Sequence, residues 1–255
     1  MLVTDDAGEP DVTAFILTGV SSQSPTVLIG DEVIRTSDLT GRSLPRFNAA
    51  AIEGQAMLAI NAHVMRRRRE LVVFHAGAVA LGDRAAIIIG RTESGKSTTT
   101  LSLLLSQSDA RPLSDELALV NVARREVEAF PRLLSIRQGA RRLLGLNALL
   151  LDWDAFEPVG VLSPSWADRA IPGAFFFIEG RAKRASVREM NLSESIFACM
   201  PSVLCGLTES NRMSVMDDVI RALGTAPAYS ITLGSPEENV RIIRELTCAV
   251  AAIPA

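Results

Sequence analysis

Cysteine, histidine and aromatic residues are scarce in this chain of 255 residues, and neither sign of charge dominates it. The three cysteines, Cys199, Cys205 and Cys248, show no C-x-x-C spacing and leave one thiol over from any disulfide pairing. Neither a disulfide framework nor a zinc site is therefore expected, and we interpret all three as buried thiols in a reducing cytoplasm. The formal net charge is −3, so the basic excess typical of nucleic-acid-binding proteins is missing and nucleic acid is not an expected partner.

Signals for secretion and for membrane insertion are also lacking. Residues 1–10 carry acidic side chains early and contain no basic region followed by a long apolar run, so no secretory signal is expected. No uninterrupted apolar segment is long enough to span a bilayer, although 48% of the residues are hydrophobic. These properties predict a cytoplasmic enzyme with a substantial apolar core and no membrane partner.

The most specific motif in the chain is a phosphate loop, G-x-x-x-x-G-K-[ST], which residues 90–97 match at every fixed position. A short apolar run over residues 84–89 has the character of a strand, and residues 97–106 have helical spacing. The motif therefore lies in the strand, loop and helix context that a nucleoside triphosphate site requires. The predicted nucleotide-binding residues are Gly90, Arg91, Thr92, Glu93, Ser94, Gly95, Lys96, Ser97 and Thr98.

Each fixed residue of the loop has a physical role. The two glycines allow backbone N–H groups to approach phosphate oxygens, and the following helix points its positive end at the same anions. Lys96 is expected to neutralise the β and γ phosphates, and Ser97 to offer its hydroxyl to Mg²⁺. Glu93 is unusual, because a carboxylate in an anion cradle is unfavourable unless it turns outward or pairs with a cation such as Arg91.

Upstream of the phosphate loop, the pattern changes from β-rich to helical. Apolar runs between residues 13 and 35, with Gly30-Asp31 as a turn signal, predict a small antiparallel sheet. Residues 47–69 carry apolar residues at helical intervals and end in a run of arginines, which suits the negative end of a helix. We divide the chain into a β-rich N-terminal segment, residues 1–46, and a nucleotide-binding domain, residues 47–255.

The strands around the phosphate loop are predicted to form a mixed sheet. Gly82-Asp83 separates the apolar run 71–81 from the strand that leads into the loop, and this signal predicts an antiparallel hairpin. Asp115 and Glu116 follow the loop closely and precede another apolar run. Further downstream, strands are expected at residues 175–178 and near Tyr229, and helices at residues 194–206, 213–223 and 236–251. Residues 152–171 lack periodicity and are interpreted either as a loop over an acceptor site or as a packed connection.

Three segments of the chain together resemble the C-terminal kinase domain of the HPr kinase/phosphorylase family. They are His75-Ala76-Gly77, residues 90–97 and Leu113-Ser114-Asp115-Glu116. The similarity is strong over residues 71–121 and looser around residues 227–233. It implies an α/β fold with a phosphate-loop core like that of the phosphoenolpyruvate carboxykinases. Residues before 70 do not resemble the N-terminal domain of the regulatory HPr kinases. The chain is more similar to compact HPr-kinase-like proteins of peptide-modification systems, including lasso peptide kinases.

This resemblance implies phosphoryl transfer from ATP, with Mg²⁺, to a serine-type hydroxyl on a peptide or small protein such as a lasso precursor peptide. Asp115 matches the family's first acid, which accepts the proton of the hydroxyl, and Glu116 takes the place of its second Asp. His75 matches a histidine beside the phosphates, and Lys96 of the phosphate loop completes the expected catalytic set. Relatives often form rings or dimers, so a homo-oligomer is one expected state.

Several of these residues have a second interpretation. The acid pair at positions 115 and 116 also fits a solvated entrance to a strand, and His75 also fits a histidine packed in a strand core. Glu128 is only a weak substitute for the acid that helps to hold Mg²⁺ in the regulatory HPr kinases. Arg132 and Arg137 fit either cationic clamps on the transferring phosphoryl group or an exposed face.

Three other functions are compatible with the sequence. The first is a small-molecule kinase of the same fold, acting on free serine or a sugar. The second is a non-catalytic regulator that binds ATP, an interpretation favoured by Glu93 and by the missing metal-binding acid. The third is an ATPase that couples hydrolysis to motion, which the early position of Asp115 disfavours.

Overall fold

The computed structural model describes residues 14–17, 26–29, 32–35, 61–63, 65–68, 70–132, 134–146, 155–156, 158–204 and 212–249. The chain divides into two compact units, residues 1–69 with 205–211, and residues 70–204 with 212–255. In the first unit, β1 (Ala14–Leu17), β2 (Thr26–Ile29) and β3 (Glu32–Arg35) form an antiparallel sheet in that order. The predicted N-terminal antiparallel sheet is thus confirmed, whereas the predicted boundary between residues 46 and 47 lies outside the described residues.

The helix predicted over residues 47–69 is described only near its end. Residues 61–63 and 65–67 are helical, and Arg67 Nη1 donates a hydrogen bond to His63 Nδ1 at 2.9 Å, one turn away. Residues 47–60 of that prediction lie outside the described residues. Within the described part of the chain, no helix has the length and hydrophobicity that crossing a membrane requires.

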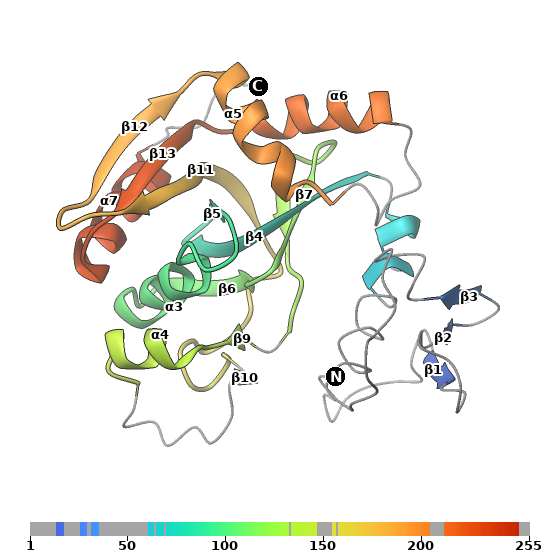
Figure 1. Ribbon diagram of the computed structural model, residues 1–255, viewed down its shortest axis with the longest axis horizontal. Coiled ribbons are helices and arrows are strands. Elements are labelled where there is room, and N and C mark those ends of the chain that lie inside the picture. The colour runs from blue at the N-terminus through green and yellow to red at the C-terminus, as the bar shows by residue number, and fades with distance from the viewer. Residues whose placement is uncertain are drawn as a thin grey trace. The chain divides into compact units, whose positions relative to one another are not determined.

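The second unit is built on an eight-stranded mixed sheet (Figure 1). Its strands run in the order β12 (Ser186–Met190), β13 (Ala228–Leu233), β11 (Arg169–Arg181), β5 (Arg84–Ile89), β4 (Leu71–Leu81), β7 (Leu117–Asn121) and β8 (Glu126–Glu128), and β6 (Ala110–Ser114) pairs with the second half of β4. β5 pairs parallel with β11 and antiparallel with β4, where Leu81 faces Arg84 across the Gly82-Asp83 turn. The predicted hairpin and the mixed α/β class are therefore confirmed.

Side chains of the central strands alternate between two apolar layers, one on each face of this sheet. Ile87 and Ile89 of β5 belong to one layer, and Ile88 belongs to the other. Because both faces are covered, these strands appear in the sequence as continuous apolar runs. Helices α3 (Lys96–Ser106) and α7 (Pro236–Cys248) cover one face, and α5 (Leu192–Cys199) and α6 (Arg212–Leu223) cover the other (Figure 1).

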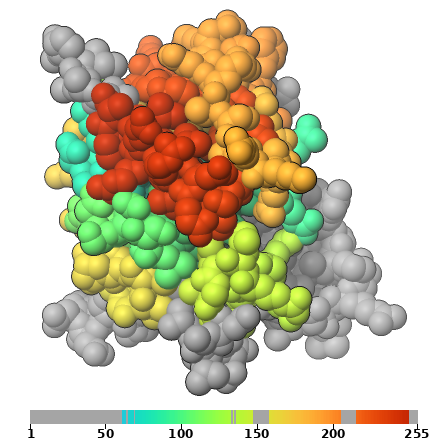
Figure 2. All heavy atoms as spheres, turned by 90° about the vertical axis from the view of Figure 1, so that its left-hand side faces the viewer, coloured from blue at the N-terminus to red at the C-terminus, as the bar shows by residue number. Residues whose placement is uncertain are grey.

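Helix α7 packs against α3, and Figure 2 shows α7 (red) between α3 (green) and β12 (orange). Its start is fixed by a capping box, in which Ser235 Oγ accepts a hydrogen bond from the backbone N–H of Glu238. Glu238 Oε2 also accepts a bond at 3.1 Å from the backbone N–H of Ala185, just before β12. Arg244 donates two bonds, of 2.6 and 3.0 Å, to the carboxylate of Asp109. These contacts tie α7 to both of its neighbours.

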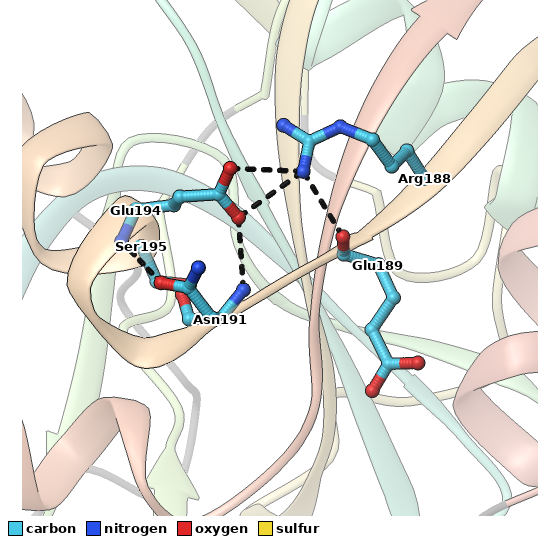
Figure 3. A network of polar contacts seen from close by, with 5 residues as sticks. All are labelled: Arg188, Glu189, Asn191, Glu194 and Ser195. Atoms are coloured by element: carbon cyan, nitrogen blue, oxygen red, sulfur yellow. Dashed lines mark hydrogen bonds and ion pairs between the residues drawn. The ribbon is translucent and has the colours of Figure 1, made fainter.

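A second capping box begins α5, next to the edge strand β12 (Figure 3). Asn191 Oδ1 accepts a bond from Glu194 N at 2.9 Å, and Glu194 Oε2 accepts one from Asn191 N at 3.0 Å. Arg188 of β12 donates to both carboxylate oxygens of Glu194, at 3.0 and 3.1 Å, and to the carbonyl of Glu189. The bond from Asn191, and then the ion pair with Arg188, lower the pKa of the Glu194 carboxyl.

Two predicted helices differ from the structure at their ends. The helix expected over residues 194–206 begins earlier, at Leu192, because the capping box lies at Asn191. It ends at Cys199 and gives way to a 3-10 turn, η2 (Met200–Ser202), where Pro201 has no N–H with which to continue the α-helix. The helix expected over residues 236–251 ends at Cys248, and residues 250–251 lie outside the described residues.

The prediction that all the cysteines are buried is wrong at one position. Cys199 is buried, whereas Cys248 is exposed, and Cys205 lies outside the described residues. Cys248 follows Thr247, which belongs to the buried side of α7, so the next residue along the helix points away from the core.

Candidate nucleotide-binding site

The predicted phosphate loop joins the end of β5 to the start of α3, as the motif requires. Its glycines are needed for steric reasons. A Cβ at position 90 would lie 2.5 Å from Ser94 Oγ, and a Cβ at Gly95 would lie 2.9 Å from both Arg181 Nη2 and Leu233 Cδ1. Gly95 also has φ 115°, a conformation that residues with a side chain rarely adopt. Glycine at position 95 is therefore favoured by both space and backbone conformation, and a side chain at position 90 would require Ser94 to move.

Lys96 points back into the loop that precedes it. Its Nζ donates hydrogen bonds to the carbonyl oxygens of Gly90, at 2.8 Å, and Arg91, at 3.1 Å. The residue is buried, at 7% exposure, and burial lowers the pKa of its ammonium group, while the charges of Asp115 and Glu116 oppose that shift. The loop thus holds a desolvated cation where the motif expects the β and γ phosphates.

A sharp turn between β6 and β7 presents the acid pair to this lysine. Ser114 Oγ accepts hydrogen bonds from the backbone N–H groups of Glu116, at 3.3 Å, and Leu117, at 2.9 Å. Within this turn Asp115 is buried, at 2% exposure, whereas the Glu116 side chain is 44% exposed. Glu116 Oε2 accepts a hydrogen bond from Arg132 Nη1 at 2.7 Å. The two adjacent carboxylates therefore occupy different environments, and the interpretation as a solvated strand entrance fits Glu116 better than Asp115.

His75 lies on β4 beside the acid turn. It faces Leu117 in the β4–β7 register, and the backbone N–H of Ala76 donates to the carbonyl of Glu116 at 3.1 Å. Burial, then the charges of Lys96 and Arg132, lower the pKa of the imidazole, and only the charge of Glu116 opposes them. The environment therefore favours the neutral imidazole over the imidazolium.

A close contact with α3 explains why the third residue of the His-Ala-Gly segment, Gly77, is a glycine. A Cβ at this position would lie 2.3 Å from Thr100 Oγ1 of α3. With threonine at position 100, glycine at position 77 therefore allows the phosphate-loop helix to approach β4 closely, which brings Lys96 at its first turn towards His75.

These residues line one cavity of about 600 Å³. Nine of the residues predicted for the site line it: His75, Thr92, Glu93, Gly95, Lys96, Ser97, Thr98, Asp115 and Glu116. The other three, Gly90, Arg91 and Ser94, line a second cavity of about 690 Å³ that is also bordered by Thr92 and Glu93. The predicted site is thus divided between two cavities that share part of the loop.

Besides Arg137, four further residues complete the first cavity from elements distant in the sequence. Arg181 lies at the end of β11, the strand that runs parallel to β5. The carboxyl ends of adjacent parallel strands meet at one edge of a sheet. The position of Arg181 just after the strand predicted at residues 175–178 is therefore a signal from which it could have been found. Gly139, Ala140 and Leu143 come from the short helix α4 (Gln138–Leu143), which no sequence signal had indicated.

Glu93 is strained, and its cation is not the one expected. It has φ 66°, which costs a residue other than glycine roughly 1–2 kcal/mol. Its carboxylate pairs with the guanidinium of Arg137, the N-cap residue of α4, rather than with Arg91. The side chains of Arg137 and Glu93 are 67% and 70% exposed, and an exposed ion pair contributes only about 0–1 kcal/mol. The ion pair therefore does not offset the backbone strain.

The residues that could hold Mg²⁺ are few. No group of three or more His, Cys, Asp or Glu side chains suited to a metal ion occurs among the described residues. Mg²⁺ in phosphoryl-transfer sites is usually held by one or two carboxylates together with water and phosphate oxygens, so such a group is not needed. Ser97 and the acid pair line the cavity and supply suitable oxygens. Glu128 is not among the residues that line it, and its Oε1 accepts a bond from Asn121 Nδ2 at 2.7 Å.

The chain matches no protein-family model and no curated protein. The first cavity combines a glycine-shaped anion cradle, a buried lysine, a buried carboxylate and a histidine whose environment favours the neutral form.

Proposed function

We propose that this protein is an ATP-dependent kinase that transfers the γ-phosphate to a serine-type hydroxyl on a peptide or small protein. The observation that carries the proposal is the position of a buried carboxylate, Asp115, in the same cavity as the phosphate loop and Lys96. Nucleotide binding alone needs the loop and the lysine. Phosphoryl transfer to a hydroxyl also needs a group that accepts the hydroxyl proton close to the phosphates.

The phosphate loop fits the triphosphate of ATP. Its two glycines carry no side chain that could cover the loop backbone, and the loop leads directly into the N-terminus of α3, where a phosphate is favoured. Lys96 is positioned to exchange its two carbonyl acceptors for phosphate oxygens, because an ammonium group binds charged oxygens more strongly than neutral ones. When bound, Mg²⁺ would neutralise charge on the β and γ phosphates, and Ser97 would hold it together with water and phosphate oxygens.

Asp115 is the better candidate for the general base, and Glu116 for a positioning residue. The Glu116 carboxylate already accepts a hydrogen bond from Arg132, and its side chain is 44% exposed, so it is held by another partner at the solvent side of the cavity. Asp115 lies buried next to the Lys96 charge, where its carboxylate can receive a proton while the lysine remains on the phosphates. A neutral His75 can orient the acceptor or the γ-phosphate by a hydrogen bond without adding charge.

The resemblance to HPr-kinase-like proteins supports the same reaction. Of the segments that carry it, His75, the acid pair and five of the eight phosphate-loop residues line the first cavity. We extend the proposal to the fold, as a carboxykinase-like phosphate-loop core, and to the acceptor class, as a precursor peptide of the lasso type. A homo-oligomeric state in the cytoplasm is part of the same proposal.

The proposal is tested by intact-mass spectrometry of acceptors incubated with the protein, Mg²⁺ and ATP. The panel contains serine-bearing precursor peptides, HPr protein, free serine and a sugar, and Asp115→Asn serves as the control. A phosphate added to a peptide or protein by the wild type alone is the expected result. Transfer to free serine or a sugar alone would point to a small-molecule kinase. ATP binding without transfer to any acceptor would favour a non-catalytic regulator.

A further inference from the structure

Among the described residues, Lys96, Arg137 and Arg181 are the lysines and arginines that line the first cavity, and Arg132 is joined to it through Glu116, which also lines it. Lys96 donates to loop carbonyls, and Arg132 donates to Glu116. Arg137 pairs with Glu93 of the loop itself. Both members of this last pair line the first cavity, so the pair stands beside the space in which the phosphates are proposed to bind.

The Glu93–Arg137 ion pair should be easier to break than the Glu116–Arg132 ion pair. Its side chains are 70% and 67% exposed, against 44% and 29% for the other pair, so water screens it more and less is lost when it opens. Its carboxylate is carried by a loop residue at φ 66°, a conformation in which glycine would be less strained. Stability therefore does not explain why a glutamate occupies this position.

We propose that Glu93 is a counter-ion that holds Arg137 at the nucleotide cavity, and that Arg137 exchanges this carboxylate for the terminal phosphate of ATP. The inference rests on the proposed nucleotide-binding function. In this arrangement Arg137 is the clamp on the γ-phosphate, and Glu93 competes with the nucleotide for it.

Charge explains the direction of the exchange. A terminal phosphate carries more negative charge than a carboxylate and offers three oxygens to the planar guanidinium, so it outcompetes an exposed glutamate. The loop backbone and Lys96 meet the β-phosphate in ATP and ADP alike. Only ATP has the γ-phosphate with which Arg137 would pair. The pair consequently sets how strongly the site prefers ATP to ADP.

The test measures the dissociation constants of ATP and ADP by isothermal titration calorimetry for the wild type, Glu93→Gln, Arg137→Gln and the double variant. Arg137→Gln should weaken ATP binding by about tenfold or more and ADP binding much less, since a charge-assisted contact to the γ-phosphate is lost. Glu93→Gln should tighten ATP binding by about threefold, because the competing ion pair is weak. In the Arg137→Gln background, Glu93→Gln should change nothing, because the two residues act through one contact.

Glu245→Gln is the matched control. Glu245 pairs with Arg241 on α7, and these side chains are 68% and 69% exposed, much like those of Glu93 and Arg137. This variant should leave both dissociation constants unchanged. Glu93→Gly, which suits the backbone at φ 66°, should tighten ATP binding as Glu93→Gln does.

Each outcome separates the inference from the proposed function. If ATP binding depends on Lys96 but Arg137→Gln weakens ATP and ADP equally or not at all, the exchange is overturned while the nucleotide site stands. A loss of ATP affinity in Glu93→Gln would also overturn it, since that would give the carboxylate a favourable role. If the wild type binds no nucleotide, both the inference and the proposed function are wrong.

Discussion

Replacing Asp115 with asparagine should separate phosphoryl transfer from nucleotide binding. The substitution keeps the shape of a side chain that is only 2% exposed, but the amide cannot accept the proton of a hydroxyl. The loss of a positioned general base lowers the rate by about 10²- to 10⁴-fold. That range corresponds to about 3–5 kcal/mol of activation free energy. ATP affinity should hold or rise, because the variant removes a negative charge close to the bound phosphates.

The neighbouring acid provides the control for this experiment. Glu116→Gln neutralises a side chain that is 44% exposed and bonded to Arg132, and an exposed pair of this kind contributes only about 0–1 kcal/mol. Its transfer rate should therefore fall by less than about tenfold. Single-turnover transfer and ATP affinity are measured for both variants, with thermal unfolding to verify that each is folded. Equal losses in the two variants, or a larger loss in Glu116→Gln, would refute the assignment of Asp115 as the base.

Three further predictions concern the cavity and its support. Lys96→Ala should abolish detectable ATP binding in calorimetry, and undiminished binding would remove the phosphate-loop assignment. Gly77→Ala places a Cβ 2.3 Å from Thr100 Oγ1 and should cost about 1–3 kcal/mol in urea unfolding; adding Thr100→Ala should restore most of that loss, and no restoration would mean that the close contact is not the cause. Burial lowers the pKa of His75 below its usual 6.5, so the unfolded chain binds the proton more readily than the folded protein. The unfolding free energy of the wild type should therefore fall relative to that of His75→Gln as the pH drops below 6.5, but not change with pH above 6.5. A difference in unfolding free energy that stays constant across this range would contradict the lowered pKa.

Local signals in the sequence predicted the elements around the phosphate loop well. The hairpin between β4 and β5 follows from Gly82-Asp83, whose two residues form the turn, and β5 and α3 follow from the motif itself. The strand β6 was missed, because Arg111-Pro112 interrupts its apolar pattern and the sequence resembles a connection. β6 is a strand because it pairs with the long β4, and a pairing between distant segments leaves no pattern in the local sequence.

The cavity was predictable only in the part that the motifs cover. His75, Lys96 and Asp115 were expected together from the resemblance, and they do line one cavity. Glu93 is exposed and pairs with a cation, as expected, but the identity of that cation was not predicted, because Arg137 is 44 residues away and reaches the loop only through the fold of α4. Contacts between exposed charges at such separations depend on how distant elements pack, and the residue types alone do not specify them.

The most direct test of the kinase assignment follows the fate of the γ-phosphate. The wild type is incubated in a single turnover with ATP labelled at either the γ or the α phosphate, together with a serine-bearing precursor peptide. A kinase should place γ label, and no α label, on the peptide serine, and Asp115→Asn should suppress this transfer. Release of the γ label only as inorganic phosphate, unaffected by the peptide, would contradict the account and identify an ATPase.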